Sequence, residues 1–118
     1  MFEKGEYTSY AACGLPYLVG GVVPEAERLV ARSPEKHRSN GIDVRTGHEV
    51  TAIDVAGQAV EVRSLADGTT FRQPFDDLVI ATGAVPIRPS LANIDAGGVA
   101  TLHTIPDAVA LDAAIWDS

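Results

Sequence analysis

A continuous apolar run near the middle of the chain limits the folds that this sequence can adopt. Residues 78–81 read Leu-Val-Ile-Ala, and the run passes directly into Thr82 and Gly83. A strand that is apolar at every position is buried on both faces, which is typical of a parallel sheet covered by helices. Such a strand needs parallel neighbours, and the chain offers residues 42–46 and 1–3 as candidates. The run therefore predicts a buried strand over residues 77–82 in an α/β fold whose sheet is incomplete.

The segment before this run has a different period. Ile42 and Val44 alternate with polar residues, and residues 49–55 and 59–65 are rich in β-forming side chains. Turn-forming residues separate these runs, and Asp67-Gly68 leads into a third run over residues 69–71. The spacing predicts a three-stranded antiparallel β-meander over residues 49–71.

Short helices are expected around these strands. Gly20-Gly21 ends a first helix over residues 15–19, and Pro24 starts a second through Arg32. Ser33-Pro34 opens a third helix that ends near Ser39. The last helix is expected to be capped by Thr104, with Pro106 and Asp107 in its first turn. Its apolar stripe is formed by Ala108, Leu111 and Ile115.

Composition excludes several classes of protein. The chain has 118 residues, enough for one ordinary domain, and a net charge of −7 with scattered basic residues, which argues against a nucleic-acid partner. No apolar run approaches the roughly 20 residues that span a bilayer, and no signal peptide is visible. We therefore expect no membrane partner and a cytoplasmic location. One cysteine and three histidines lack metal-ligand spacing, so no metal site is expected.

Cys13 lies where the first helix is expected to begin. A free cysteine is commonly buried and inert. At the start of a helix, however, the positive end of the dipole and the unpaired N–H groups favour the reactive thiolate. Two further segments suit a nucleotide: Thr82-Gly83 at the end of the apolar strand, and Glu3-Lys4, where an acidic residue can accept from ribose hydroxyls.

Three motifs resemble those of a known family in their order and spacing. They are Ser9-Tyr10-x-x-Cys13-Gly14-Leu15-Pro16-Tyr17, the run of residues 41–50, and Leu78-Val79-Ile80-Ala81-Thr82-Gly83-Ala84-x-Pro86. Together they resemble the FAD-dependent pyridine nucleotide-disulfide oxidoreductases, in the branch of the coenzyme A disulfide reductases and NADH oxidases or peroxidases.

The resemblance implies a redox role for Cys13. NADH or NADPH would reduce FAD, and FAD would reduce the Cys13 sulfur beside the flavin ring. Leu18 stands where two-cysteine relatives carry the second cysteine, so Cys13 would cycle through a sulfenic acid or a mixed disulfide with coenzyme A. The acceptor would be coenzyme A disulfide or a small oxidant such as oxygen or peroxide, and Ser9 matches a coenzyme A contact. Complete members are homodimers.

The resemblance also assigns cofactor-binding residues. Glu3 and Lys4 would contact the adenosine ribose of FAD, and Val50 would contact adenine through its backbone. Thr82 and Gly83 would line the FAD cleft. The fold it implies is an incomplete, Rossmann-like FAD-binding domain with the β-meander inserted.

Residues 1–118 depart from the family pattern. The sequence contains no G-x-G-x-x-G run, which in the family opens the FAD-binding domain and holds the FAD pyrophosphate at a helix N-terminus. The resemblance places the NAD(P)-binding and dimerisation domains beyond Trp116, so we expect an internal, partial FAD-binding domain that is inactive alone. Two alternatives stay open: a non-catalytic truncated fragment that self-associates through strand edges, and a binding module with a reactive thiol and no flavin.

Overall fold

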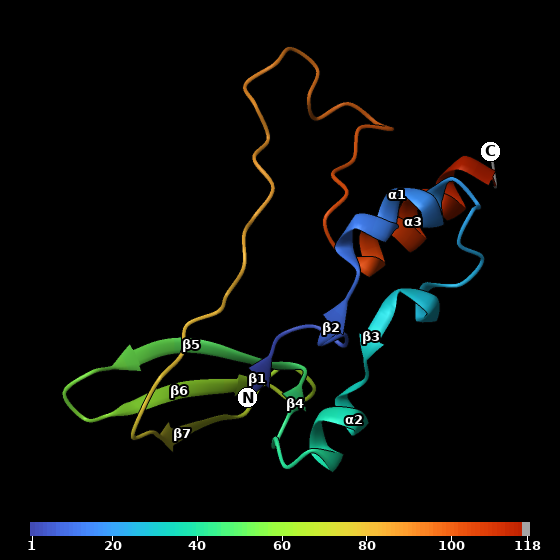
Figure 1. The fold of residues 1–118 in the computed structure, drawn as a ribbon. Helices are drawn as coiled ribbons and strands as arrows, with labels where there is room; N and C mark the ends of the chain where they lie inside the picture. The colour runs from blue at the N-terminus through green and yellow to red at the C-terminus, as the bar shows by residue number, and fades with distance from the viewer. Residues whose placement is uncertain (117–118) are drawn as a thin grey trace. The chain divides into compact units, whose positions relative to one another are not determined.

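The computed structural model describes residues 1–116, and its elements can be followed by colour in Figure 1. The chain divides into two compact units. The first contains residues 1–9 and 32–81, and the second contains residues 10–31 and those from Thr82 onward. Among the described residues, no helix is long and apolar enough to cross a membrane.

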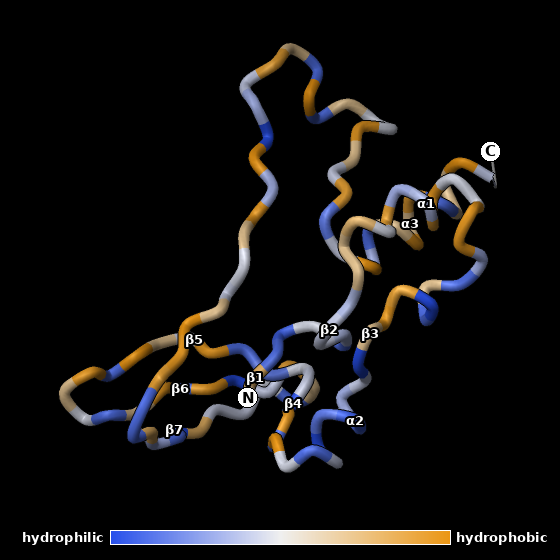
Figure 2. Tube along the Cα trace, in the orientation of Figure 1, coloured by the Kyte–Doolittle hydropathy of each residue, from blue (hydrophilic) through white to orange (hydrophobic). Residues whose placement is uncertain are grey.

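The first unit contains the expected meander. Strands β5 (His48–Asp54), β6 (Ala59–Ser64) and β7 (Thr70–Pro74) are antiparallel in the order β5-β6-β7. Val60 and Val62 on β6 are buried, whereas Glu61 and Arg63 are exposed. Successive side chains of a strand point to opposite faces, so this alternation is expected of a half-buried strand. The alternating colours along these strands are visible in Figure 2. The predicted meander is confirmed.

Two short strands form a parallel pair in the same unit. β1 (Phe2–Glu3) pairs with β4 (Arg45–Thr46), with Phe2 opposite Arg45. These are parts of the two segments that the sequence offered as parallel neighbours for the apolar run, and they pair with each other. Helix α2 (Pro34–Ser39) is also as expected, because the Ser33 hydroxyl accepts from the Lys36 N–H at 3.2 Å and caps it.

The apolar run itself is not a strand. Residues 75–104 form neither helix nor strand, and Val79 and Ile80 are 86% and 65% exposed. The prediction of a buried strand at residues 77–82 is therefore wrong for this structure. Its apolar residues stand out in Figure 2. The physical reason is that a parallel strand forms only against a hydrogen-bonding neighbour, and the two segments expected to flank the run pair with each other as β1 and β4.

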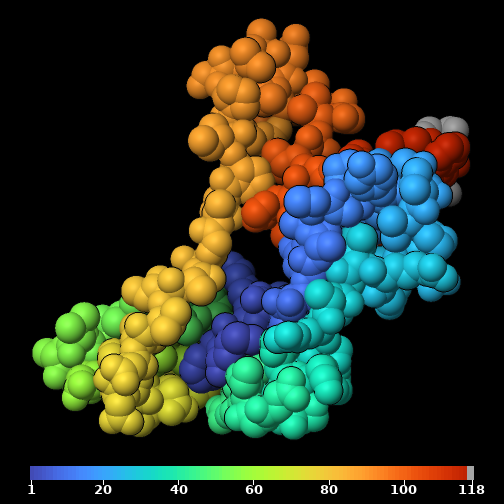
Figure 3. All heavy atoms as spheres, viewed as in Figure 1, coloured from blue at the N-terminus to red at the C-terminus, as the bar shows by residue number. Residues whose placement is uncertain are grey.

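The second unit is helical. A 3₁₀ turn, η1 (Ala12–Gly14), runs into α1 (Leu15–Val19), and a second 3₁₀ turn, η2 (Ala26–Leu29), follows. Helix α1 packs against α3 (Ile105–Trp116), and the atoms of these two helices lie against each other in Figure 3. The core of this unit consists of the buried residues Leu15, Leu18, Ala26, Leu29, Ile105 and Ala108.

The helix predicted from Pro24 to Arg32 is mostly wrong. Only residues 26–29 are helical, as the 3₁₀ turn η2, and β3 (Val30–Arg32) is a strand that pairs with β2 (Ser9–Tyr10). The Leu29 carbonyl accepts from the Ala11 N–H at 2.8 Å. Hydrogen bonds to a distant segment therefore override the local helix preference at this point.

The start of α3 is capped as predicted, and the cap predicts a pH-dependent stability. Asp107 accepts from the Thr104 and His103 N–H groups at 2.8 and 3.1 Å, and the Thr104 hydroxyl accepts from the Asp107 N–H. Hydrogen bonds from Thr104 and then His103 lower the pKa of the Asp107 carboxyl. A lowered folded-state pKa gives stability that is full above the unfolded value, about 3.9 for Asp, and is lost as pH falls through the folded value.

We therefore expect Asp107→Asn to lower the free energy of unfolding by up to about 1 kcal/mol at neutral pH. The difference from the wild type should shrink below about pH 4, where the wild-type carboxylate becomes protonated. Urea unfolding of both proteins between pH 2 and 7 measures this difference. A difference that stays constant over the whole range would contradict the proposed role of the Asp107 charge.

Candidate functional site

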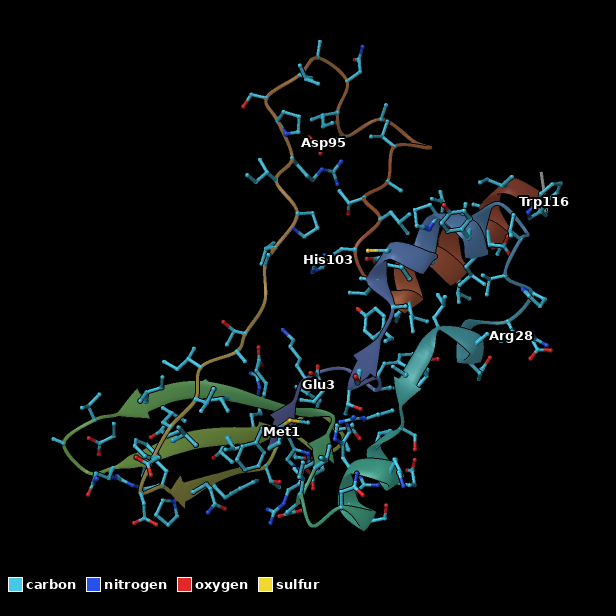
Figure 4. All side chains as sticks on the ribbon, viewed as in Figure 1. Met1, Glu3, Arg28, Asp95, His103 and Trp116 are labelled. Carbon is cyan, nitrogen blue, oxygen red and sulfur yellow. The ribbon has the colours of Figure 1, made fainter. Side chains whose placement is uncertain are left out.

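The two units divide the seven candidate residues between them. Glu3, Lys4, Ser9 and Val50 belong to the first unit, and the other three, Cys13, Thr82 and Gly83, belong to the second. Ser9 begins β2 and is partly exposed. Glu3, labelled in Figure 4, ends β1.

Cys13 lies in the 3₁₀ turn η1, two residues before α1 begins at Leu15, and its side chain is exposed. The turn is held by backbone hydrogen bonds. The Gly14 N–H donates to the Ala11 carbonyl at 2.8 Å, and the Ala11 N–H donates to the Leu29 carbonyl at the same distance. The thiol is therefore accessible on a turn whose backbone is fixed at two points. This placement at the start of a helix agrees with the sequence-based expectation.

The residues after Cys13 explain why the turn forms where it does. Leu15 points into the core and is only 3% exposed, and Pro16 suits the first turn of α1, where a missing N–H is no loss. Gly14 permits a close approach: a Cβ atom there would lie 2.4 Å from Leu29 Cδ2. Leu29 is itself buried, so it has little room to move.

This close approach gives a testable consequence. We expect Gly14→Ala to lower the free energy of unfolding by about 1–3 kcal/mol, because the added methyl group must displace Leu29 within a packed core. Gly97→Ala is the matched control in the same unit, since a Cβ at Gly97 meets open space. Urea unfolding of both variants makes the comparison. Equal stability of the two variants would show that Leu29 adjusts freely and does not fix the Cys13 turn.

Thr82 and Gly83 lie in the exposed segment between β7 and α3. Gly83 has a φ of +70°, a conformation that glycine adopts without the strain other residues meet. The structure places these two residues in a segment that is neither helix nor strand, and it does not place them at the end of a strand as the sequence predicted. A left-handed glycine is compatible with a backbone that approaches a ligand closely.

In the first unit, charged side chains gather beside β1. Lys4 Nζ lies 2.9 Å from Glu49 Oε1, and Arg63 Nη2 lies 2.5 Å from Glu49 Oε2. Hydrogen bonds from Lys4 and then Arg63 lower the pKa of the Glu49 carboxyl. Glu3 is also held, because its Oε1 accepts from the Gly5 N–H at 2.7 Å. Both predicted ribose-binding residues are therefore fixed by contacts within their own unit.

Sequence reasoning missed Glu49, which lies next to Val50. The signal that would have found it is the register of the predicted meander: Glu49 on β5 faces Arg63 on β6, and opposite charges at facing positions attract. Val50 is 40% exposed, and the register of β5 shifts between Val50 and Ala52.

The sequence analysis also did not predict an aromatic cluster in the first unit. The rings of Phe2, His48 and Phe71 lie 6.0–6.2 Å apart between centroids, and the Arg45 guanidinium lies 5.8 Å from the Phe2 ring and 6.0 Å from the Phe71 ring. Edge and tilted ring contacts at these distances stabilise packing, and so does a cation over a ring face. The cluster ties β1 to the meander and so fixes the strand that carries Glu3.

The polar groups at the end of β1 fit part of a nucleotide. A carboxylate accepts from hydroxyl groups and a lysine ammonium donates to them, so Glu3 and Lys4 together match the two kinds of hydrogen bond that a ribose makes. Both lie beside the parallel pair of β1 and β4, and the carboxyl end of parallel strands is where open α/β sheets bind nucleotides. Within residues 1–116, no three His, Cys, Asp or Glu side chains are grouped to hold a metal ion.

Known proteins resemble the chain over almost its whole length. A family model described as pyridine nucleotide-disulphide oxidoreductase matches residues 1–115. An NADH oxidase of Enterococcus faecalis is 35% identical over 99 residues, which is 84% of this chain and 22% of that protein. A coenzyme A disulfide reductase of Staphylococcus aureus is 33% identical over 113 residues, which is 95% of this chain and 25% of that protein.

A solved structure has the same fold. The crystal structure of reduced CoADR-RHD from Bacillus anthracis matches with a TM-score of 0.93 at 34% identity, covering 99% of this chain and 21% of that chain. The chain therefore spans a quarter or less of the length of these proteins.

Proposed function

The chain belongs to the pyridine nucleotide-disulphide oxidoreductase family, and we propose that it is the cysteine-bearing part of a flavin-dependent oxidoreductase. Bound FAD would supply two-electron redox chemistry with NAD(P)H as the electron donor, and the sulfur of Cys13 would be the group that is reduced. The observation that supports this role most strongly is the exposed Cys13 on a turn fixed by backbone hydrogen bonds at Gly14 and Ala11, in a chain that matches the family over residues 1–115.

The proposed cofactor contacts follow the chemistry of each residue. Glu3 and Lys4 bind the adenosine ribose, and the backbone at Val50 contacts adenine. Thr82 and Gly83, which are exposed, are the residues proposed to line the FAD cleft. These assignments rest on residue chemistry and on the placement of each residue within its own unit.

The proposed acceptor is coenzyme A disulfide. Cys13 thiolate attacks one sulfur of the disulfide, which releases one coenzyme A thiol and leaves a mixed disulfide on Cys13. Reduction of this mixed disulfide by two electrons and two protons would release the second coenzyme A thiol and return Cys13 to the thiol, and bound FAD would be the source of the electrons. Ser9 is the proposed coenzyme A contact. Oxygen or peroxide is the second candidate acceptor, because a lone accessible cysteine can also cycle through a sulfenic acid and one relative is an NADH oxidase.

The working state that we propose is a homodimer in the cytoplasm. A cysteine that must return to the thiol in every cycle suits a compartment that keeps thiols reduced.

A hybrid enzyme tests the proposed function. In it, residues 1–115 of this chain replace the matching segment of the Staphylococcus aureus coenzyme A disulfide reductase. We expect the purified hybrid to be yellow and to oxidise NADH or NADPH when coenzyme A disulfide is added. A folded but colourless hybrid would overturn the flavin assignment. A yellow hybrid that reduces oxygen or peroxide and leaves coenzyme A disulfide untouched would favour the second acceptor.

A further inference from the structure

Glu49 joins two cations that come from different strands. Lys4 follows β1 directly, Glu49 lies on β5 and Arg63 lies on β6. One carboxylate oxygen of Glu49 contacts Lys4 Nζ at 2.9 Å, and the other contacts Arg63 Nη2 at 2.5 Å. Arg63 thus anchors the Glu49 carboxylate through one oxygen, and the other oxygen of that carboxylate contacts the Lys4 ammonium.

The exposed fractions of these side chains show that Lys4 is the one that packing against surrounding residues does not hold in place. The Lys4 side chain is 69% exposed, while the Glu49 side chain is only 24% exposed. An exposed lysine has many rotamers, and fixing its ammonium in one place has a large entropic penalty. A carboxylate that is anchored beforehand reduces the penalty that a ligand would otherwise meet on binding.

We propose that Glu49 is a positioning residue that holds Lys4 Nζ in place for the adenosine ribose of FAD. This inference rests on the proposed function, because Lys4 must contact the cofactor for its position to matter. Lys4, Glu49 and Arg63 together carry a net charge of +1, which the carboxylate of Glu3, the other proposed ribose contact, offsets, so the inference rests on the position of the Lys4 ammonium.

A simpler role for Glu49 makes a different prediction. If Glu49 and Arg63 only stabilise the meander as a cross-strand pair, losing Glu49 would affect stability and leave Lys4 unchanged. Asp54 provides the matched control, because it forms a similar pair with Arg72 between β5 and β7 at 2.5 Å and contacts no lysine there. Asp54→Asn therefore removes a comparable cross-strand pair without touching Lys4.

The reactivity of Lys4 measures how firmly Glu49 holds its ammonium group, and the measurement needs no cofactor. Lys4 and Lys36 are the only lysines in the sequence, so limited acetylation with a water-soluble amine-reactive ester, followed by peptide mass spectrometry, gives their reactivity ratio. We expect Glu49→Gln to raise acetylation of Lys4 relative to Lys36 by roughly threefold or more, because the ammonium loses its charge-assisted hydrogen bond. Asp54→Asn should leave the ratio unchanged. An unchanged ratio in Glu49→Gln would overturn the inference.

The affinity of the hybrid enzyme for FAD tests the functional half of the inference. Removing the negative charge of Glu49 should by itself strengthen binding of an anionic cofactor, whereas losing the position of Lys4 should weaken it. We expect Glu49→Gln to raise the FAD dissociation constant roughly threefold, Lys4→Met to raise it about tenfold, the value of one charge-assisted hydrogen bond, and Asp54→Asn to leave it unchanged.

The outcomes separate the two proposals. If Lys4→Met leaves FAD affinity unchanged, the proposed ribose contact of Lys4 is wrong, whatever Glu49 does. If Lys4→Met weakens binding while Glu49→Gln strengthens it or leaves it unchanged, the ribose contact stands and the positioning role of Glu49 is wrong.

Discussion

Replacing Cys13 with serine in the hybrid enzyme should lower the rate of coenzyme A disulfide reduction by on the order of 10³-fold or more, as loss of a catalytic nucleophile does. The hydroxyl of serine is nearly isosteric with the thiol but forms no disulfide, so no mixed disulfide with coenzyme A can form. FAD should stay bound, because the substitution changes none of the proposed FAD contacts, and three of the five, Glu3, Lys4 and Val50, belong to the other unit. Steady-state oxidation of NAD(P)H and the flavin absorbance of the purified variant measure the two effects.

A control variant guards against a trivial loss of activity. Ser39→Ala changes a surface residue of α2, whose hydroxyl donates to the Lys36 carbonyl within that helix, and it should leave turnover near the wild-type rate. Cys13→Ser with undiminished reduction of coenzyme A disulfide would show that Cys13 is not the redox residue. Cys13→Ser that also loses its flavin would show that Cys13 supports the fold or the cofactor directly.

The 118-residue chain alone should show no oxidation of NAD(P)H above the background of free FAD. The FAD pyrophosphate is normally held by a glycine-rich turn at a helix N-terminus, and this sequence contains no G-x-G-x-x-G run. The contacts proposed for Glu3, Thr82 and Gly83 should not replace those charge-assisted hydrogen bonds, because affinity depends on a cleft that is already organised. We therefore expect weak or no retention of FAD.

The exposed apolar segment should also make the isolated chain self-associate. Val79, Val85 and Ile87 are 86%, 86% and 88% exposed, and apolar residues on an extended segment attract further copies. The assay mixes the purified chain with FAD and NADH or NADPH, adds coenzyme A disulfide or oxygen, and follows NAD(P)H absorbance. Sedimentation gives the oligomeric state. Flavin-dependent oxidation by a monomer would contradict both expectations.

Local patterns predicted most of the secondary structure. The meander, the cap of α3 and the Ser33 cap of α2 follow from residues that are close in sequence, where turn and capping chemistry acts over a few positions. The apolar run at residues 78–81 has an equally clear pattern, but it forms no strand because its pairing depends on a neighbour that the described residues do not supply. A local pattern predicts what a segment prefers and cannot by itself provide its partner.

The candidate site was predictable in part for the same reason. The accessible thiol of Cys13 at the start of a helix follows from Gly14, Leu15 and Pro16 beside it. The contact between Lys4 and Glu49 joins residues 45 positions apart, and it became visible only once β1 and β5 were placed together. The role of each residue toward FAD stays a prediction from its chemistry.

The number of electrons that the hybrid enzyme accepts tests the central proposal most directly. FAD takes up two electrons and a mixed disulfide on Cys13 takes up two more, so anaerobic reduction of the oxidised hybrid carrying bound coenzyme A should consume about four electrons per FAD. The Cys13→Ser variant should consume about two. A wild-type hybrid that takes up about two electrons, with all of its FAD reduced and coenzyme A still attached to Cys13, would contradict the transfer of electrons from flavin to this cysteine.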